Sequence, residues 1–142
     1  MSYRDFKKPK INTGLKISVS NEAITKESTL DYPVFCFKHL DNKFGLDNCD
    51  QEDKIALLVR LTKLSQLTWN DIKLSDRHGF GTEKIPTNII QSERPPFLSD
   101  DINHLLAFRF NKLAPFLGHR SGSIFHIVYI DSKFSLYNHG KK

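Results

Sequence analysis

Side chains that transfer protons or hold phosphate are concentrated in the second half of the chain. Five of the six histidines lie after residue 75, namely His78, His104, His119, His126 and His139. Imidazole titrates near neutral pH, so each of these side chains is a candidate general acid or base. Their spacing does not place two imidazoles on one helix turn, and the chain has only two cysteines. The sequence therefore predicts no metal site.

A glycine-rich stretch joins an arginine, a histidine and a glutamate. Arg77 and His78 precede Gly79, and Glu83 follows four residues later. Around one RNA phosphate, these three groups would suffice for cleavage without a metal. Glu83 or His78 takes the proton of the 2′-hydroxyl, Arg77 stabilises the phosphorane, and the other acid protonates the leaving oxygen. The alternative interpretation is an ordinary turn in which glycine allows a positive φ.

The glycines do not form a nucleotide-binding motif. Gly79-x-Gly81 lacks the strand, turn and helix that surround a dinucleotide fingerprint. The sequence also contains no GxxxxGK[ST], GxSxG or HExxH pattern, and these are the signatures of P-loop ATPases, α/β-hydrolases and zinc proteases. The sequence therefore predicts none of those enzyme classes and no bound cofactor.

Three polar side chains lie on strands that are otherwise apolar. A two-residue turn at Ser121-Gly122 would place Arg120 and Tyr129 on one face of the sheet. An equally tight turn at residues 112–113 would bring Arg109 to the same face. A half-buried strand must satisfy such polar groups, so these three residues are the most informative in the region.

These polar side chains have two interpretations. In the first, the arginines pair with acids such as Asp131 or Glu83, and the Tyr129 hydroxyl reaches a backbone carbonyl. In the second, Arg109 and Arg120 line a concave basic surface for phosphate, and Tyr129 stacks on a base or orients it.

The hairpin also carries a family resemblance. The sequence of Phe116–Tyr129, FLGHRSGSIFHIVY, resembles the β-hairpin of RelE/YoeB-type toxins, in which a glycine, an arginine and a turn precede an Ile-Val-Tyr-like strand. The resemblance is confined to about residues 105–137. Members of that family are small ribosome-dependent mRNA endonucleases that an antitoxin protein holds inactive.

The resemblance implies roles for individual residues and for partners. Arg120, His126 and Tyr129 would match the phosphate-binding and strand positions of the family. Its C-terminal catalytic side chain would correspond to His139 or Tyr137. RNA, the ribosome and an antitoxin protein are the partners that the resemblance implies.

Two helices are expected before this region. Residues 51–66 form the stronger one, because Asp50 and Asp53 make a carboxylate variant of the capping box. Ile55, Leu58 and Val59 begin a stripe at 3.6-residue spacing, widened by neighbouring leucines, so the helix is expected to bury this face against a sheet. A second, shorter helix is predicted to start at Thr68, again with a capping-box pattern.

Alternation and apolar runs predict the strands. Two N-terminal strands are expected at residues 15–20 and 32–37. A C-terminal antiparallel β-meander is expected at 105–110, 116–120 and 123–130, with a last short strand at 134–137. In this register Arg120 pairs with Ser123 and Phe116 with Ile127. Residues 75–101 are poorly patterned and are predicted to form a long loop.

Together these elements predict an α+β fold, with the antiparallel meander packed on one main helix. The 142 residues suit a flexible basic arm at 1–14 and a single domain at 15–142.

Residues 1–16 hold five Lys or Arg and one Asp, residues 17–101 hold ten Lys or Arg against fourteen Asp or Glu, and residues 102–142 hold six Lys or Arg against one Asp. The positive charge thus belongs to the two ends, where it would attract phosphate. With no secretory signal and no apolar run of membrane-spanning length, a cytoplasmic location without membrane contact is expected.

The functional prediction is an RNA-interacting protein, in its specific form a toxin-like endoribonuclease without a metal. Arg109, Arg120, Arg77 and His78 are the predicted phosphate ligands. His126 or His139 is predicted to transfer protons, and Tyr129 to orient the substrate. The alternative is a non-enzymatic interaction module, antitoxin-like or accessory, that binds another protein through exposed phenylalanines.

Overall fold

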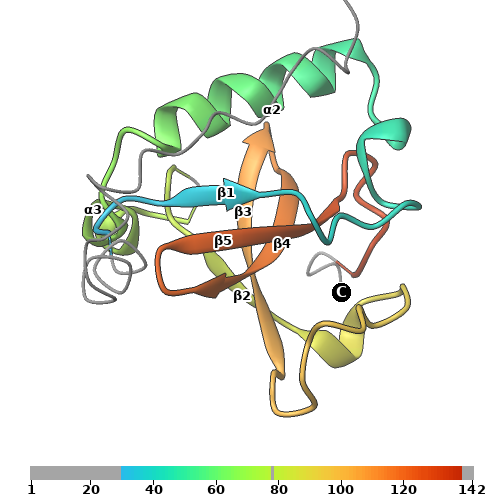
Figure 1. The fold of residues 1–142 in the computed structure, drawn as a ribbon. Coiled ribbons are helices and arrows are strands. Elements are labelled where there is room, and N and C mark those ends of the chain that lie inside the picture. Colours follow the sequence, from blue (N-terminus) through green and yellow to red (C-terminus); the bar gives the residue numbers. More distant parts are fainter. Residues whose placement is uncertain (1–29, 78, 139–142) are drawn as a thin grey trace, which may run out of the picture.

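The computed structural model describes residues 30–77 and 79–138, which form an α+β fold (Figure 1). Its centre is a five-stranded sheet with the strand order β1-β5-β4-β3-β2. The predicted strand at 15–20 and the basic arm at 1–14 lie outside the described residues.

The predicted antiparallel meander is confirmed. It consists of β3 (His104–Asn111), β4 (Ala114–Ser121) and β5 (Ile124–Ile130), each antiparallel to the next. The two edges of the sheet are short strands. β1 (Val34–Cys36) runs parallel to β5, and β2 (Glu83–Pro86) runs antiparallel to β3.

Both predicted helices are present, and their N-termini are capped as expected. In α2 (Gln51–Leu64), Asp53 N–H donates to the Asp50 carboxylate at 2.8 Å, and the Asp53 side chain accepts from Asp50 N–H. α3 (Trp69–Leu74) has the reciprocal pair between Thr68 and Asp71. Two short 3-10 helices, η2 (Leu46–Asn48) and η3 (Thr87–Ile89), complete the described elements.

Each face of the sheet covers its own apolar core. α2 and α3 pack on one face, where Leu57, Leu61 and Leu64 meet aromatic side chains of β3, β4 and β5. The other face is covered by irregular segments before β3 and after β5, and its core includes Ile85, Leu98 and Leu136. Figure 1 shows α2 lying across one side of the sheet and the yellow connection before β3 on the other.

One loop serine ties segments that are far apart in the sequence. Ser123 O accepts from Val34 N–H at 2.9 Å and from Trp69 Nε1 at 3.2 Å. The Ser123 hydroxyl donates to Leu30 O. The turn before β5 therefore holds β1 and α3 in place.

The predicted buried face of α2 is wrong. Ile55, Leu58 and Val59 are 55%, 64% and 49% exposed. The buried side chains are instead Leu57, Leu61 and Leu64, the leucines that were expected only to widen the buried stripe. Because apolar residues occupy most of the helix circumference, periodicity alone did not select the correct side.

The predicted register of the hairpin is also wrong. Arg120 pairs with Phe125 and Ser121 with Ile124, because the turn is centred on Gly122 and Ser123, and Gly122 has a φ of 64°. Further along, the register shifts between Leu117 and Gly118, which inserts one extra residue into β5. Such a bulge moves each later side chain of the strand to the opposite face of the sheet from the one that simple alternation predicts.

Two expectations outside the meander also need correction. Residues 134–137 form no strand. They form an irregular segment in which Ser135 and Leu136 N–H donate to the buried carboxylate of Asp131, at 2.8 and 3.0 Å. The predicted loop at 75–101 contains β2 and η3. β2 was not predicted because its sequence, Glu-Lys-Ile-Pro, has only one buried apolar side chain and therefore no alternating pattern, and because it ends in proline.

Within the described part of the chain, no helix is both long and apolar enough to cross a membrane.

Candidate functional site

A pocket with a volume of 410 Å³ lies beside β2, at the edge of the sheet. It takes residues from four separate parts of the sequence: Arg77 before β2, residues 83–89, residues 109–113 and the segment after β5. Its polar lining consists of Arg77, Glu83, Lys84, Arg109, Tyr137 and Asn138. We call it the arginine pocket.

One carboxylate in this pocket serves two arginines. Glu83 forms an ion pair with Arg109, and its second oxygen lies 3.3 Å from Arg77. The Arg109 side chain is 10% exposed and that of Arg77 is 54% exposed. The inner arginine is therefore fixed, whereas the outer one reaches the solvent.

The strand position of Arg109 explains why it is buried. Its neighbours Phe108 and Phe110 point into the core beneath α2, so Arg109 faces the opposite side of the sheet. There its Nη1 donates to Leu113 O at 2.8 Å, across the β3–β4 turn. Among the described residues no acceptor reaches its buried Nε.

Tyr137 adds a proton donor to the pocket. Burial raises the pKa of its hydroxyl to about 12, although the neighbouring charge of Arg109 acts in the opposite direction. The hydroxyl therefore keeps its proton at neutral pH. Tyr137 lies beyond β5, in the segment that the buried Asp131 carboxylate holds in place.

The charges of the pocket favour an anion. Arg77, Arg109 and Lys84 supply three positive charges, and Glu83 supplies one negative charge. Two guanidinium groups from different elements can donate to a phosphate in a fixed geometry. The pocket therefore has the donors and the net charge that a phosphate group needs.

Arg120 does not belong to this pocket. It is exposed at the end of β4, and its guanidinium lies 4.0 Å from the centre of the Trp69 ring, on the α3 side of the sheet. Its Nε donates to Gly122 O at 2.8 Å. Among the described residues it forms no ion pair. Arg109 and Arg120 thus lie on opposite faces.

His126 lies in a second environment, away from both arginines. Its ring centroid is 5.6 Å from that of His39 and 5.8 Å from that of Phe97, which itself stacks on His39 at 3.9 Å. Burial lowers the pKa of His126, and the charges of His39 and His119 lower it further. Its Nδ1 is buried without a hydrogen-bond partner among the described residues.

Tyr129 is not placed to orient a substrate. Its side chain is 1% exposed, and its hydroxyl donates to Glu93 O at 2.7 Å. The bulge in β5 turns it away from Phe125 and Ile127 and into the second core. Tyr129 thus has the backbone-carbonyl partner of the first interpretation, whereas Arg109 pairs with Glu83 and also lines the arginine pocket.

The structure brings together only part of the predicted site. Arg77 and Arg109 meet at Glu83, whereas Arg120, His126 and Tyr129 lie elsewhere. His78 and His139 lie outside the described residues. In the sequence they are neighbours of Arg77 and Asn138, which line the pocket.

Lys84 and Asn138 were missed as pocket residues. The signal for Lys84 was its place next to Glu83, but it becomes meaningful only once residues 83–86 are known to be an edge strand. Asn138 carried no signal, because its position depends on how the chain turns after β5.

Among residues 30–77 and 79–138, no group of three or more His, Cys, Asp and Glu side chains is arranged to hold a metal ion. No protein-family model matches the chain, and no curated protein or solved structure is significantly similar to it.

Proposed function

We propose that this protein binds RNA at the arginine pocket and cleaves it as a toxin-like endoribonuclease. The observation that carries the proposal is the pair of arginines that share Glu83. Because two arginines share one carboxylate, net positive charge remains beside the protonated hydroxyl of Tyr137. Of the residues that the resemblance to RelE/YoeB-type toxins implies, Tyr137 lines this pocket, whereas Arg120, His126 and Tyr129 lie elsewhere.

The proposed reaction is attack of the RNA 2′-oxygen on the adjacent phosphorus. The new O2′–P bond forms as the P–O5′ bond breaks, giving a 2′,3′-cyclic phosphate and a 5′-hydroxyl. Arg77 and Arg109 stabilise the charge on the non-bridging oxygens. Preorganised cations of this kind supply much of the rate enhancement in phosphoryl transfer.

Two proton transfers complete the reaction. The Glu83 carboxylate accepts the proton of the 2′-hydroxyl, and the Tyr137 hydroxyl donates a proton to the leaving O5′, after which solvent restores both groups. His78 and His139 remain the predicted alternatives for these transfers.

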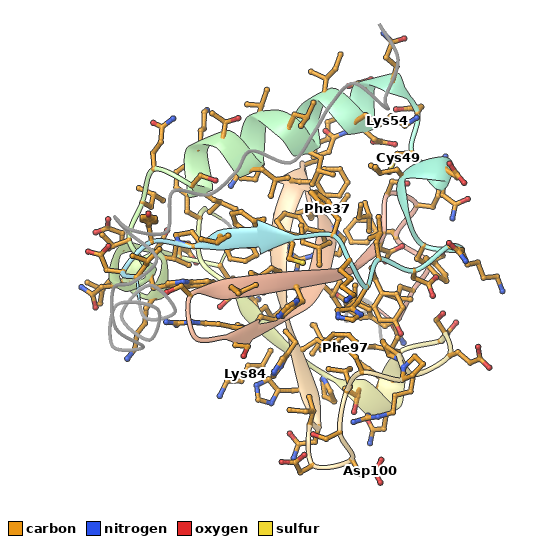
Figure 2. All side chains as sticks on the ribbon, in the orientation of Figure 1. Phe37, Cys49, Lys54, Lys84, Phe97 and Asp100 are labelled. Atoms are coloured by element: carbon orange, nitrogen blue, oxygen red, sulfur yellow. The ribbon has the colours of Figure 1, made fainter. Side chains whose placement is uncertain are left out.

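The test is cleavage of a defined RNA by the purified protein, with and without ribosomes, and with the product ends identified. We expect a 2′,3′-cyclic phosphate end, and a loss of activity of at least about 100-fold in Glu83→Gln and Arg77→Ala, the usual scale for acid–base and electrostatic groups. Lys54→Ala is the matched control, because Figure 2 shows Lys54 on α2, on the far side of the molecule from Lys84. If no variant differs from the wild type, or if no RNA is bound or cut, the proposal is wrong.

A second candidate function, a protein-interaction module, is favoured by the outer face of α2. Ile55, Leu58 and Val59 are about half exposed or more and lie at i, i+3 and i+4, which forms a continuous apolar strip. Such a strip fits the apolar side of a partner's amphipathic helix. Of the predicted phenylalanines, Phe37 and Phe134 are exposed, at 42% and 41%.

Co-purification with the wild type but not with Leu58→Glu would identify such a partner. Leu57→Ala serves as the comparison, because this buried leucine tests for loss of folding instead of loss of the strip. A partner that binds both Leu58→Glu and the wild type equally would contradict this second function.

A further inference from the structure

A second surface with phosphate-binding character lies around Arg120. Two adjoining hollows, each of 160 Å³, share Arg120 and Leu106 in their linings. One also contains His104 and the other Lys73. None of the described residues that line these hollows is acidic, so the surface is suited to an anionic ligand.

The Arg120 guanidinium forms a flat platform within this surface. Trp69 is 6% exposed and lies beneath the guanidinium, whereas Arg120 itself is exposed. One face of the guanidinium is therefore covered by the indole, and the other faces the solvent. RNA bases stack on such arginine planes.

The platform and the arginine pocket lie on the two sides of one sheet edge. Lys84 of β2 lines the arginine pocket, and its register partner in β3, Leu106, lines both hollows. The next pair that faces the same way is Pro86 of β2 and His104 of β3. Pro86 lines the arginine pocket, and His104 lines one of the two hollows. Neighbouring strands are about 4.8 Å apart. Arg120 belongs to β4, two strands in from β2, so roughly 10 Å of sheet lies between the platform and the β2 edge.

Lys84 occupies the crossing between the two sites. It is exposed on the outermost strand of the sheet. Lysine and proline on an edge strand prevent another β-strand from pairing with it. This edge therefore stays accessible to a ligand that does not form backbone hydrogen bonds with the strand. A lysine here places a positive charge where a phosphate backbone would pass from one face to the other.

We propose that single-stranded RNA bound in the arginine pocket continues over the β2 edge at Lys84 and stacks a base on the Arg120–Trp69 platform. The inference rests on the proposed function and names its substrate class. A duplex does not fit this path, because double helices resist sharp bending over such a short distance.

The test compares short and long RNAs on the complete chain. The probes are single strands of about four and about 16 nucleotides, spanning the usual site sizes for single strands. Both carry one 2′-deoxy substitution at the cleavage position, and a duplex of the longer sequence serves as a third probe. Affinity is measured by fluorescence anisotropy over a range of salt concentrations.

We expect Arg120→Ala to weaken binding of the long strand about tenfold, on the scale of one lost stacking interaction, and to leave the short strand unchanged. Arg120→Lys keeps the charge but not the plane, so it should behave like Arg120→Ala. Lys84→Ala should lower the slope of log affinity against log salt by about one for the long strand. Lys54→Ala should change neither value, and the duplex should bind more weakly than the long strand.

The outcomes separate the two proposals. If the wild type binds neither strand, the proposed function itself fails. If it binds both, and Arg120→Ala and Arg120→Lys unfold at the wild-type temperature but affect short and long strands equally or not at all, the RNA site stands and the second subsite is wrong. A duplex that binds as tightly as the long strand would also overturn it.

Discussion

Glu83 sits between two arginines whose environments differ. Arg109 is nearly buried and needs the carboxylate, because a buried charge without a partner is costly. Arg77 is more than half exposed, so its pair with Glu83 is weakened by solvent. The same carboxylate therefore stabilises the fold on one side and tunes the charge of the pocket on the other.

Replacing Glu83 by Ala should lower the free energy of unfolding by about 2 kcal/mol, less than for a fully buried pair because Glu83 is partly exposed. Arg77→Ala should lower it by less than about 1 kcal/mol, as expected for an exposed pair. Urea unfolding followed by Trp69 fluorescence measures both. Equal effects of the two substitutions would contradict this division of roles.

His126 makes stability depend on pH. The groups that face it are His39 and His119, and His119 in turn lies near His104 and Asp101. Because its folded pKa is lowered from 6.5, the neutral ring is favoured in the folded state. This contribution is fully present above the unfolded pKa and is lost as the pH falls through the folded value.

The wild type should therefore lose more stability than His126→Gln between about pH 7 and about pH 5, the range in which an ordinary histidine titrates. Thermal unfolding at several pH values measures the difference. Hydrogen bonds at the helix N-termini lower the pKa of the Asp50 and Asp71 carboxyls from the ordinary value, which moves their titration further from this window. Parallel pH profiles for the two proteins would show that His126 is not responsible.

Among the elements, β4 has no space for a larger side chain at one position. A Cβ on Gly118 would lie 2.1 Å from His126 O and 2.7 Å from the Phe125 ring. This close approach accompanies the register shift that moves Tyr129 to the second core. The glycine thus belongs to the geometry of the bulge.

Gly118→Ala should destabilise the protein by at least about 3 kcal/mol, because backbone and ring atoms must both move. The matched control is Gly79→Ala, whose nearest neighbour would be Ser75 Oγ at 3.3 Å and whose cost should stay below about 1 kcal/mol. Chemical unfolding of the soluble variants measures the difference. Wild-type stability of Gly118→Ala would mean that the bulge adjusts more easily than the geometry indicates.

Local signals in the sequence were sufficient for the helix starts and for the meander. Asp50 and Thr68 identify their helices because a capping box is encoded within four residues. The facing of α2 and the bulge in β5 were not predictable, since both depend on packing between distant segments. For the site, the sequence grouped Arg77 with Glu83 and offered Glu83 as one possible partner of Arg109. The pairing of β2 with β3 then brings Glu83 to Arg109.

At the scale of the molecule, the charge is divided between the ends and the middle. Residues 1–16 carry a net charge of +4, residues 17–101 carry −4 and residues 102–142 carry +5. Counterion release from RNA depends on how many phosphates the cations contact, so the ends should contribute affinity without base preference.

Deleting residues 1–14 should therefore weaken RNA binding uniformly across sequences and lower its salt dependence, while the cleavage position stays the same. Binding titrations at several salt concentrations and product mapping measure these two properties. A changed cleavage position would show that the N-terminal residues take part in selecting the substrate.

The ties made by Ser123 have a consequence for synthesis of the protein. β1 and α3 are translated long before the turn that anchors them, and Tyr137 of the arginine pocket follows later still. Contacts of such high sequence separation form only after the late segments have left the ribosome. Until residues 123–138 have emerged, a nascent chain would therefore lack both the hydrogen bonds of Ser123 and a complete lining of the arginine pocket.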